Sequence, residues 1–320
     1  MNKLLIFALV LFTSCAQNSV QENSNMSMTV DWSKSEDRAI PKIEGGAYGN
    51  QYGPSVNSEK DPNQVGSRNN DDKTLKGLAL VLGAGGYRCI GYISFLKEMA
   101  MRESRTLVPN IVIGHGLASV IASYYAFGYN PDYIEWKFFG FIRKVKEVQI
   151  YSEEWLKLYE SELIDELRDK RIEDSELTLM VAVYDNRLKE VKYLKRGSLR
   201  EALMANVTLL SKKKLTPAFP RSYIDKKILK KMGVENVIGI DVLSHGISWK
   251  KGNGRVNGLF EKAASQFIKS KKNLHGETSY PLKDYSLDDV SLISKIVFVS
   301  KKYSKDFIEA FENKNNVKGQ

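Results

Sequence analysis

A short apolar run that leads into a glycine-rich loop and then into a helix is the feature that most limits the fold of this chain. The run Leu78–Leu82 is followed by Gly83-Ala84-Gly85-Gly86, and helical spacing of apolar residues continues through Met99. Glycines in such a loop let the backbone turn sharply at the end of a strand. The pattern predicts a strand, a glycine loop and a helix, which is the repeating unit of α/β proteins.

Similar patterns recur along the chain, each with an apolar run near a helical pattern. Further strands are predicted at 108–113, 177–184, 237–240 and 296–300, and further helices at 117–127, 198–205 and 224–232. Strands that alternate with helices favour a parallel sheet covered on both faces, with any site at the carboxyl ends of the strands. We therefore predict a three-layer α/β fold with a mainly parallel sheet.

The first residues of the chain have the composition of an export signal. Lys3 precedes the apolar run Leu4–Phe12, and the small residues Thr13 and Ser14 precede Cys15. The run is too short to span a bilayer, which takes about 20 residues. Its end resembles a bacterial lipobox, so we predict a signal peptide at 1–14 and acylation at the cysteine that follows. A plain secretory signal with an incidental cysteine is the alternative.

The segment after the predicted signal differs from the rest of the chain. Residues 15–72 are rich in Asn, Ser, Gly and Asp and have few periodic apolar positions, which predicts a flexible tether. The folded domain is expected at 73–310 and a C-terminal tail at 311–320. An acylated Cys15 implies a protein of the cell envelope, anchored to a bacterial membrane and facing the periplasm or the exterior. Cys89 is then left without a disulfide partner.

Charge and histidine content indicate which ligands the chain is expected to bind. The formal net charge is +10, but the lysines are dispersed and diluted by nearby glutamates, and no nucleic-acid-binding signature accompanies them. A net positive charge would attract anionic membrane surfaces or nucleic acid, but we interpret these lysines as solvated faces of helices. Only three histidines occur, without metal-ligand spacing, so we expect neither a metal nor a cofactor.

The first glycine loop, together with the strand before it, resembles the oxyanion loop of patatin-like phospholipases. In that family a strand runs into a glycine-rich loop with a basic residue, and loop amides stabilise the negative charge that develops during acyl transfer. Cys89 stands where the family prefers glycine. The resemblance assigns the remnant of this loop to Gly83, Gly85, Gly86 and Arg88.

A dinucleotide-binding loop is the other interpretation of these glycines. That fingerprint needs a third glycine, which would fall at Arg88, and an acidic residue at the end of the next strand. The chain has neither at the required place, so the dinucleotide interpretation is rejected.

The second glycine loop resembles the family's Gly-x-Ser-x-Gly turn, which carries the nucleophile between a strand and a helix. The flanking residues match, from Gly114 through the helix to Pro131, but Gly116 holds the nucleophile position and has no hydroxyl. Ala118 replaces the closing glycine. Ser119 is a weak substitute, because it lies about one helical turn from the tip of the loop. His115 has no role in the family's Ser-Asp dyad.

The aspartate of the family's dyad has no counterpart in this chain. Counting back from Asp241 places it near Pro217, within the stretch Leu215–Pro220, which contains no carboxylate. Asp225 is the nearest acid downstream and falls in a predicted helix. Asp185 and Asp241 end predicted strands, and we interpret both as structural.

Taken with both losses, the resemblance implies a lipid-anchored pseudoenzyme that binds a lipid, an acyl group or a partner without cleaving it. One alternative is an active acyl hydrolase with a relocated nucleophile. Another is a structural interaction protein on a hydrolase scaffold, because a fold does not by itself determine a function. The resemblance covers roughly residues 77–310 and is poor from 243 to 289.

Overall fold

Most of the predicted domain is described by the computed structural model. The described residues are 77–102, 107–208, 215–217, 229–230, 232–234, 236–243, 246–248 and 276–317. The predicted signal peptide, the tether and Cys15 lie outside these residues, as does most of the predicted helix 224–232. All described residues belong to one compact unit, Tyr52–Gln320.

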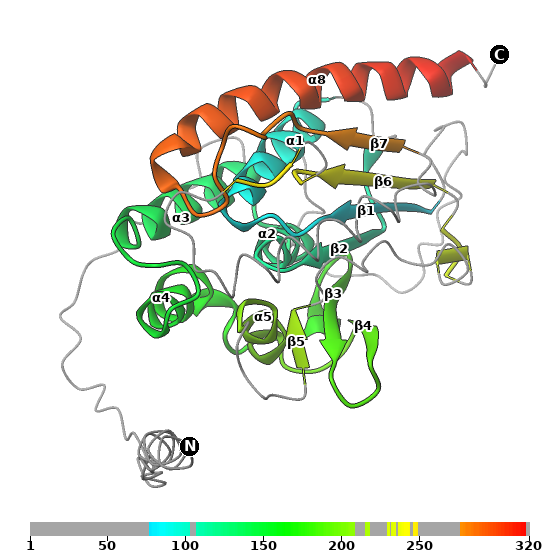
Figure 1. The fold of residues 1–320 in the computed structure, drawn as a ribbon. Helices are drawn as coiled ribbons and strands as arrows, with labels where there is room; N and C mark the ends of the chain where they lie inside the picture. Colours follow the sequence, from blue (N-terminus) through cyan, green and yellow to red (C-terminus); the bar gives the residue numbers. More distant parts are fainter. Residues whose placement is uncertain are drawn as a thin grey trace, which may run out of the picture. The chain divides into compact units, whose positions relative to one another are not determined.

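The described residues build a seven-stranded mixed sheet in the order β4-β3-β2-β1-β6-β7, with β5 pairing separately with β3 (Figure 1). The strands are β1 Leu78–Leu82, β2 Ile111–His115, β3 Thr178–Asp185, β4 Glu190–Leu194, β5 Leu215–Pro217, β6 Asn236–Asp241 and β7 Gly276–Ser279. Strands β3, β2, β1, β6 and β7 are parallel, whereas β4 and β5 run antiparallel to β3. The predicted α/β class with a mainly parallel sheet is confirmed.

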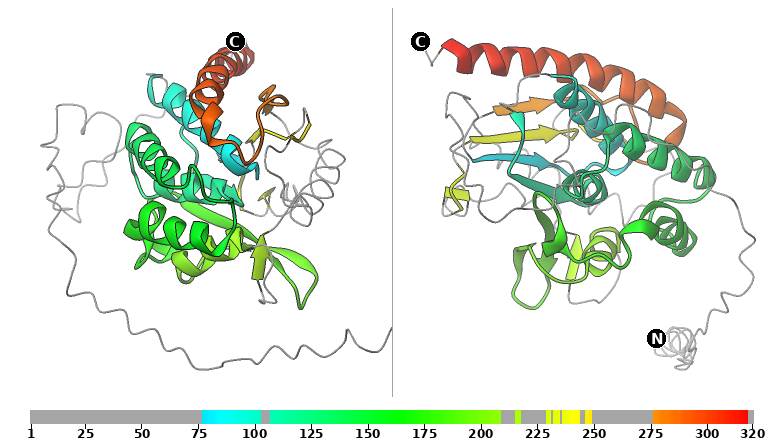
Figure 2. Two further views of the ribbon diagram at one scale, coloured as in Figure 1. Left: turned by 60° about the vertical axis from the view of Figure 1, so that its left-hand side comes forward. Right: turned by 180° about the vertical axis from the view of Figure 1, so that it is seen from behind.

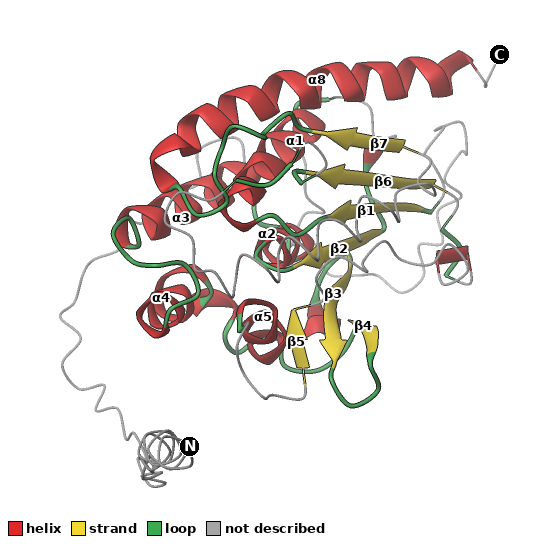
Figure 3. Cartoon of the chain, viewed as in Figure 1, coloured by secondary structure: helices red, strands yellow, loops and turns green. Residues whose placement is uncertain are grey.

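Helices occupy the connections from β1 to β2, from β2 to β3 and from β4 to β5 (Figure 3). The α-helices are α1 Gly91–Ala100, α2 Ala118–Ala126, α3 Pro131–Lys144, α4 Glu153–Leu158, α5 Leu199–Val207 and α8 Ile293–Val317. Shorter helical turns are η2 Gly86–Ile90, η4 Tyr159–Leu163, η5 Asp165–Leu167, η6 Ile172–Asp174 and η8 Val290–Leu292. Asn130, Ser152 and Ser198 cap α3, α4 and α5 by accepting a backbone amide hydrogen, which explains where these helices begin.

The sheet buries side chains on both of its faces because successive residues of a strand point in opposite directions. Leu80 and its neighbours at alternate positions of β1 join the larger core with α1, α2, α3 and α8. Ala79 and Val81 join a smaller cluster with Leu229 and Val234. Figure 2 shows α1, α2, α3 and α8 gathered on one side of the sheet. The carboxyl ends of β1 and β2 therefore meet the helices that follow them.

The predicted strand at 296–300 is wrong, because these residues lie inside α8. Ile296 and Ser300 are buried, whereas Phe298 between them is 77% exposed. Burial that recurs every three to four residues is the helical period, and a continuous apolar run conceals it in the sequence. The helix also continues beyond residue 310, where the tail was predicted to begin. The edge strand next to β6 is β7, which comes from a stretch in which no strand was predicted.

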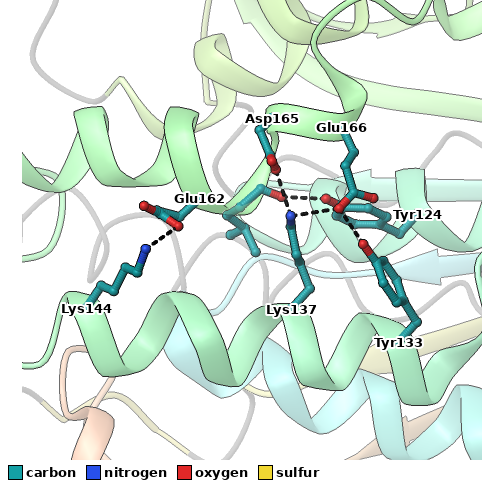
Figure 4. Close-up of polar contacts among 8 residues, drawn as sticks. Tyr124, Tyr133, Lys137, Lys144, Glu162, Asp165 and Glu166 are labelled. Atoms are coloured by element: carbon teal, nitrogen blue, oxygen red, sulfur yellow. Dashed lines mark hydrogen bonds and ion pairs between the residues drawn. The ribbon is translucent and has the colours of Figure 1, made fainter. Parts of the chain in front are cut away.

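A polar network joins α3 to the segment that contains η4 and η5 (Figure 4). The Lys137 ammonium lies 2.8 Å from carboxylate oxygens of both Asp165 and Glu166. The Tyr124 hydroxyl, from α2, donates to the backbone carbonyl of Leu163 at 2.7 Å. Tyr133 donates to the Glu166 carboxylate. These contacts hold α2 and α3 against one segment, which fixes the helix that follows the second glycine loop.

Candidate functional site

The turn between β2 and α2 has the geometry of a strand-to-helix elbow, and Gly116 lies at its tip. Strand β2 ends at His115 and α2 begins at Ala118. The φ angle of Gly116 is +56°, a left-handed conformation that side chains other than glycine rarely adopt. The sharp turn predicted here is therefore present, and the residue at its tip carries no side chain that can attack a substrate.

The side chains of Ser119 and His115, next to the tip in the sequence, are buried and bonded within the chain. The Ser119 hydroxyl donates to the Gly116 carbonyl at 2.6 Å and has no exposed surface. The Nδ1 atom of His115 lies 3.1 Å from the Leu82 carbonyl, and its ring packs edge-on against Tyr193. Both side chains thus stabilise the junction of strand and helix, and the serine oxygen faces the backbone of its own turn.

Asn206 also supports the elbow, although the sequence did not predict it as a site residue. Its side-chain carbonyl accepts the Gly116 amide hydrogen at 2.8 Å, and its amide group donates to the Ala202 carbonyl at 3.1 Å. The residue is fully buried in α5. The only sequence signal was an asparagine within an otherwise apolar helical stretch, because its partner lies 90 positions away.

The first glycine loop connects β1 to η2 and approaches the elbow. Its first amide, on Gly83, donates to the Ile240 carbonyl at 3.2 Å and so continues the pairing of β1 with β6. Gly86 has a φ angle of +54°, and a Cβ atom there would lie 2.6 Å from the Leu287 carbonyl oxygen. The loop therefore needs glycine at this position both for its backbone conformation and for space.

The Cys89 sulfur lies between the glycine loop and the first turn of α2. The thiol donates to the Gly83 carbonyl at 3.9 Å, and the side chain is fully buried. Burial raises the pKa of the thiol far above its usual range. The thiol stays protonated and unreactive.

Arg88 was expected to be a remnant of the basic oxyanion loop, and its guanidinium is completely buried. Its Nε donates to the Tyr285 carbonyl at 2.5 Å. Nη1 donates to the carbonyls of Val242 and Gly246 at 3.0 and 2.7 Å. Nη2 donates to the Ser248 hydroxyl and the Lys283 carbonyl at 3.2 and 3.4 Å. These five contacts match the five N–H groups of a guanidinium, which leaves none for a phosphate or a carboxylate.

The position predicted for the catalytic aspartate lies on β5. Pro217 pairs with Val183, and Leu215 pairs with Asp185 at the end of β3. The Asp185 carboxylate accepts two amide hydrogens of the β3–β4 turn and lies 2.8 Å from the Lys192 ammonium. Asp241 accepts the Leu243 amide hydrogen at 2.8 Å. Both aspartates hold the backbone beyond their strands.

The described residues contain neither a cluster of metal ligands nor a membrane span. Within that part of the chain, no three His, Cys, Asp or Glu side chains are arranged to hold a metal ion. None of the described helices combines the length and the apolar character that crossing a membrane requires.

Comparisons with known proteins give distant structural similarity but no sequence match. No protein family model matches the sequence, and no curated protein matches it. A chain in the 1.92 Å crystal structure of full-length SpcU in complex with full-length ExoU, from the type III secretion system of Pseudomonas aeruginosa, is similar in structure. The TM-score is 0.38 at 10% sequence identity, over 74% of this chain and 53% of that chain. This chain thus spans about half the length of its structural neighbour.

Proposed function

We propose that this chain is a lipid-anchored protein of the bacterial envelope whose patatin-like domain has no hydrolytic activity and works by binding. The observation that carries this proposal is the glycine at residue 116. It lies at the left-handed tip of the turn from β2 to α2, where acyl transfer on this kind of fold requires a nucleophilic side chain.

The surroundings of the elbow support the absence of catalysis. The nearest hydroxyl, on Ser119, is buried and donates to the Gly116 carbonyl. The Cys89 sulfur is buried beside the glycine loop, where its thiol donates to the Gly83 carbonyl at 3.9 Å. A substrate carbonyl placed between these loops would have to displace that sulfur.

The bonding of Arg88 bears on what the domain binds. A hydrolase site would use a basic residue here to attract a phosphate or a carboxylate, but all five guanidinium N–H groups already serve acceptors of the chain. This favours a domain that serves as an interaction scaffold. It disfavours binding of an anionic head group at the glycine loop.

The test uses the full chain, purified from membranes in detergent, and a fluorophosphonate probe that labels activated serines. We expect no covalent labelling and no turnover of short-chain esters or phospholipids above buffer. Labelling that disappears in Ser119→Ala but persists in Ser123→Ala would refute the proposal and support a relocated nucleophile. Ser123 is the matched control because it is also a buried serine of α2 that donates to a carbonyl one turn earlier.

A second experiment changes the elbow and the glycine loop together. Gly116→Ser combined with Cys89→Gly restores a hydroxyl at the tip and removes the sulfur, yet it supplies no base. We expect this variant to remain without turnover, because a serine hydroxyl needs an adjacent base to become a nucleophile. Turnover by the wild-type chain at the same level as a known esterase, whatever the variant does, would contradict the proposal.

A further inference from the structure

The outer face of α8 carries an exposed aromatic side chain within a group of lysines. Phe298 is 77% exposed, the largest exposed fraction among the large apolar side chains of the described residues. Around it lie Lys295, Lys301, Lys302 and Lys305, all exposed. These lysines stand three, four or seven positions from Phe298, so they share one face of the helix with it. We call these five residues the α8 outer face.

The opposite side of α8 accounts for the position of this face. Ile293, Ile296, Ser300, Ser304 and Ile308 are buried. They pack toward α1 and the sheet edge, and the Ser304 hydroxyl lies 2.6 Å from the Tyr280 hydroxyl. Because the helix is held by this inner side, the exposure of Phe298 is not needed for folding. Figure 1 shows α8 along the outside of the domain.

The charges of α8 are divided between its two halves. In its second half, Glu309 and Glu312 pair with Arg102 at 3.2 and 3.5 Å. Among the described residues, none of the four lysines of the outer face lies within ion-pair distance of a carboxylate. The first half of the helix thus presents uncompensated positive charge around one apolar ring.

We propose that the α8 outer face binds the surface of an anionic phospholipid bilayer, with Phe298 inserted at the interface and the four lysines against the head groups. An apolar side chain with flanking lysines is the arrangement that interfacial helices use, since the ring leaves water while the ammonium groups stay hydrated near anionic lipid. The proposal extends the lipid anchoring proposed above, which would keep the domain near such a surface.

The charge complementarity favours a bilayer over a protein partner. Four lysines on flexible stems can follow a fluid array of head groups, whereas protein interfaces are depleted in lysine and enriched in arginine. The chain as a whole carries a formal net charge of +10, which adds to the attraction toward an anionic surface.

The experiment measures co-sedimentation of the full chain with vesicles. The Cys15→Ala chain is used so that acylation does not contribute. Vesicles of phosphatidylglycerol and phosphatidylethanolamine supply the anionic surface, and vesicles of phosphatidylcholine supply the neutral one. We expect binding to the anionic vesicles only, reduced about fivefold by Phe298→Ala and at least about tenfold by Lys301→Gln/Lys302→Gln/Lys305→Gln.

A matched control removes the same charge elsewhere. Arg143→Gln/Lys146→Gln/Lys157→Gln changes three exposed cations in and near α3 and α4, and it should bind anionic vesicles within about twofold of the parent chain. Equal losses in both triple variants would show attraction by net charge alone and would overturn the proposal. So would unchanged binding of the α8 variants, or no binding of the parent chain. Far-UV circular dichroism of each variant verifies its fold.

The two proposals fail separately. If the α8 variants lose vesicle binding while the wild-type chain hydrolyses esters, membrane binding by the α8 outer face is supported. The proposal that the chain lacks hydrolytic activity is then refuted. If the chain has no hydrolytic activity but the Cys15→Ala parent does not bind anionic vesicles, membrane binding by the α8 outer face is refuted. The pseudoenzyme proposal is then unaffected.

Discussion

At the scale of single residues, the side chains around the elbow and the glycine loop are buried and bonded within the chain. Gly116 retains a left-handed conformation without a functional group. Cys89 fills the space between the two loops. Arg88 ties the loop to the segments around residues 242–248 and 283–285. Substitutions at these residues should therefore change the stability of the domain.

Arg88→Met should destabilise the domain strongly. The substitution removes the donors of four backbone carbonyls and one hydroxyl in a buried place, and breaking such a site costs about 3–5 kcal/mol. Burial lowers the pKa of Arg88 to about 10 against the opposing effect of Asp241, so the guanidinium is still charged at neutral pH. Urea unfolding measures the loss, and the exposed Arg143→Met should stay within about 0.5 kcal/mol of wild type. A comparable loss in both variants would contradict the assignment.

Gly116→Ala and Gly140→Ala should change stability in opposite directions. At residue 116 the left-handed backbone penalises a Cβ atom by about 1–2 kcal/mol. Gly140 lies inside α3, and a Cβ atom added there would meet no heavy atom within 4 Å, so alanine should stabilise the helix by about 0.5–1 kcal/mol. Thermal unfolding of both variants checks the pair. An unchanged midpoint for Gly116→Ala would argue against a strained turn.

At the scale of elements, local patterns predicted the strands and helices that carry the two loops, and non-local pairing limited the rest. Strands β1, β3 and β6 lie within about a residue of their predicted bounds because each is a short buried run next to turn residues. The apolar run at 296–300 was wrongly predicted as a strand. It belongs to α8, whose buried side is defined by packing against α1 and not by the local sequence. β5 depends on pairing with β3 from a distant position, which no local pattern encodes. Asn206 likewise acquired its role from a distant partner, Gly116.

The β3–β4 turn should lose stability in acid. The Lys192 ammonium is the main cause that lowers the pKa of Asp185 from 3.8 to about 2, and the amides of the turn add to it against the effect of burial. A carboxylate with a depressed folded-state pKa contributes stability that is present above its unfolded value and is lost as pH falls toward the folded value. We expect this contribution to disappear between about pH 4 and pH 2. Asp185→Asn should flatten that part of the stability–pH curve, and an unchanged curve would show that other groups cause it.

At the scale of the whole molecule, the membrane attachment that we propose combines two separate features. The predicted acylation site is at Cys15, and the proposed lipid-facing surface is on α8, in the part of the chain that the structure describes. An acyl anchor is insensitive to salt, whereas attraction between lysines and anionic head groups is screened at high ionic strength. Salt dependence therefore distinguishes the two contributions in one fractionation experiment.

Cys15→Ala should make release of the protein from the membrane fraction dependent on salt. Wild-type chain expressed in a bacterial host is expected in the membrane fraction at low salt and at about 0.5 M salt, because lipid holds it. The variant should stay partly bound at low salt and enter the soluble fraction at high salt, where only the α8 outer face remains and is screened. Adding Lys301→Gln/Lys302→Gln/Lys305→Gln should release it at low salt as well. Retention of Cys15→Ala at high salt, as expected for wild type, would rule out the acyl anchor as the cause of salt-resistant attachment.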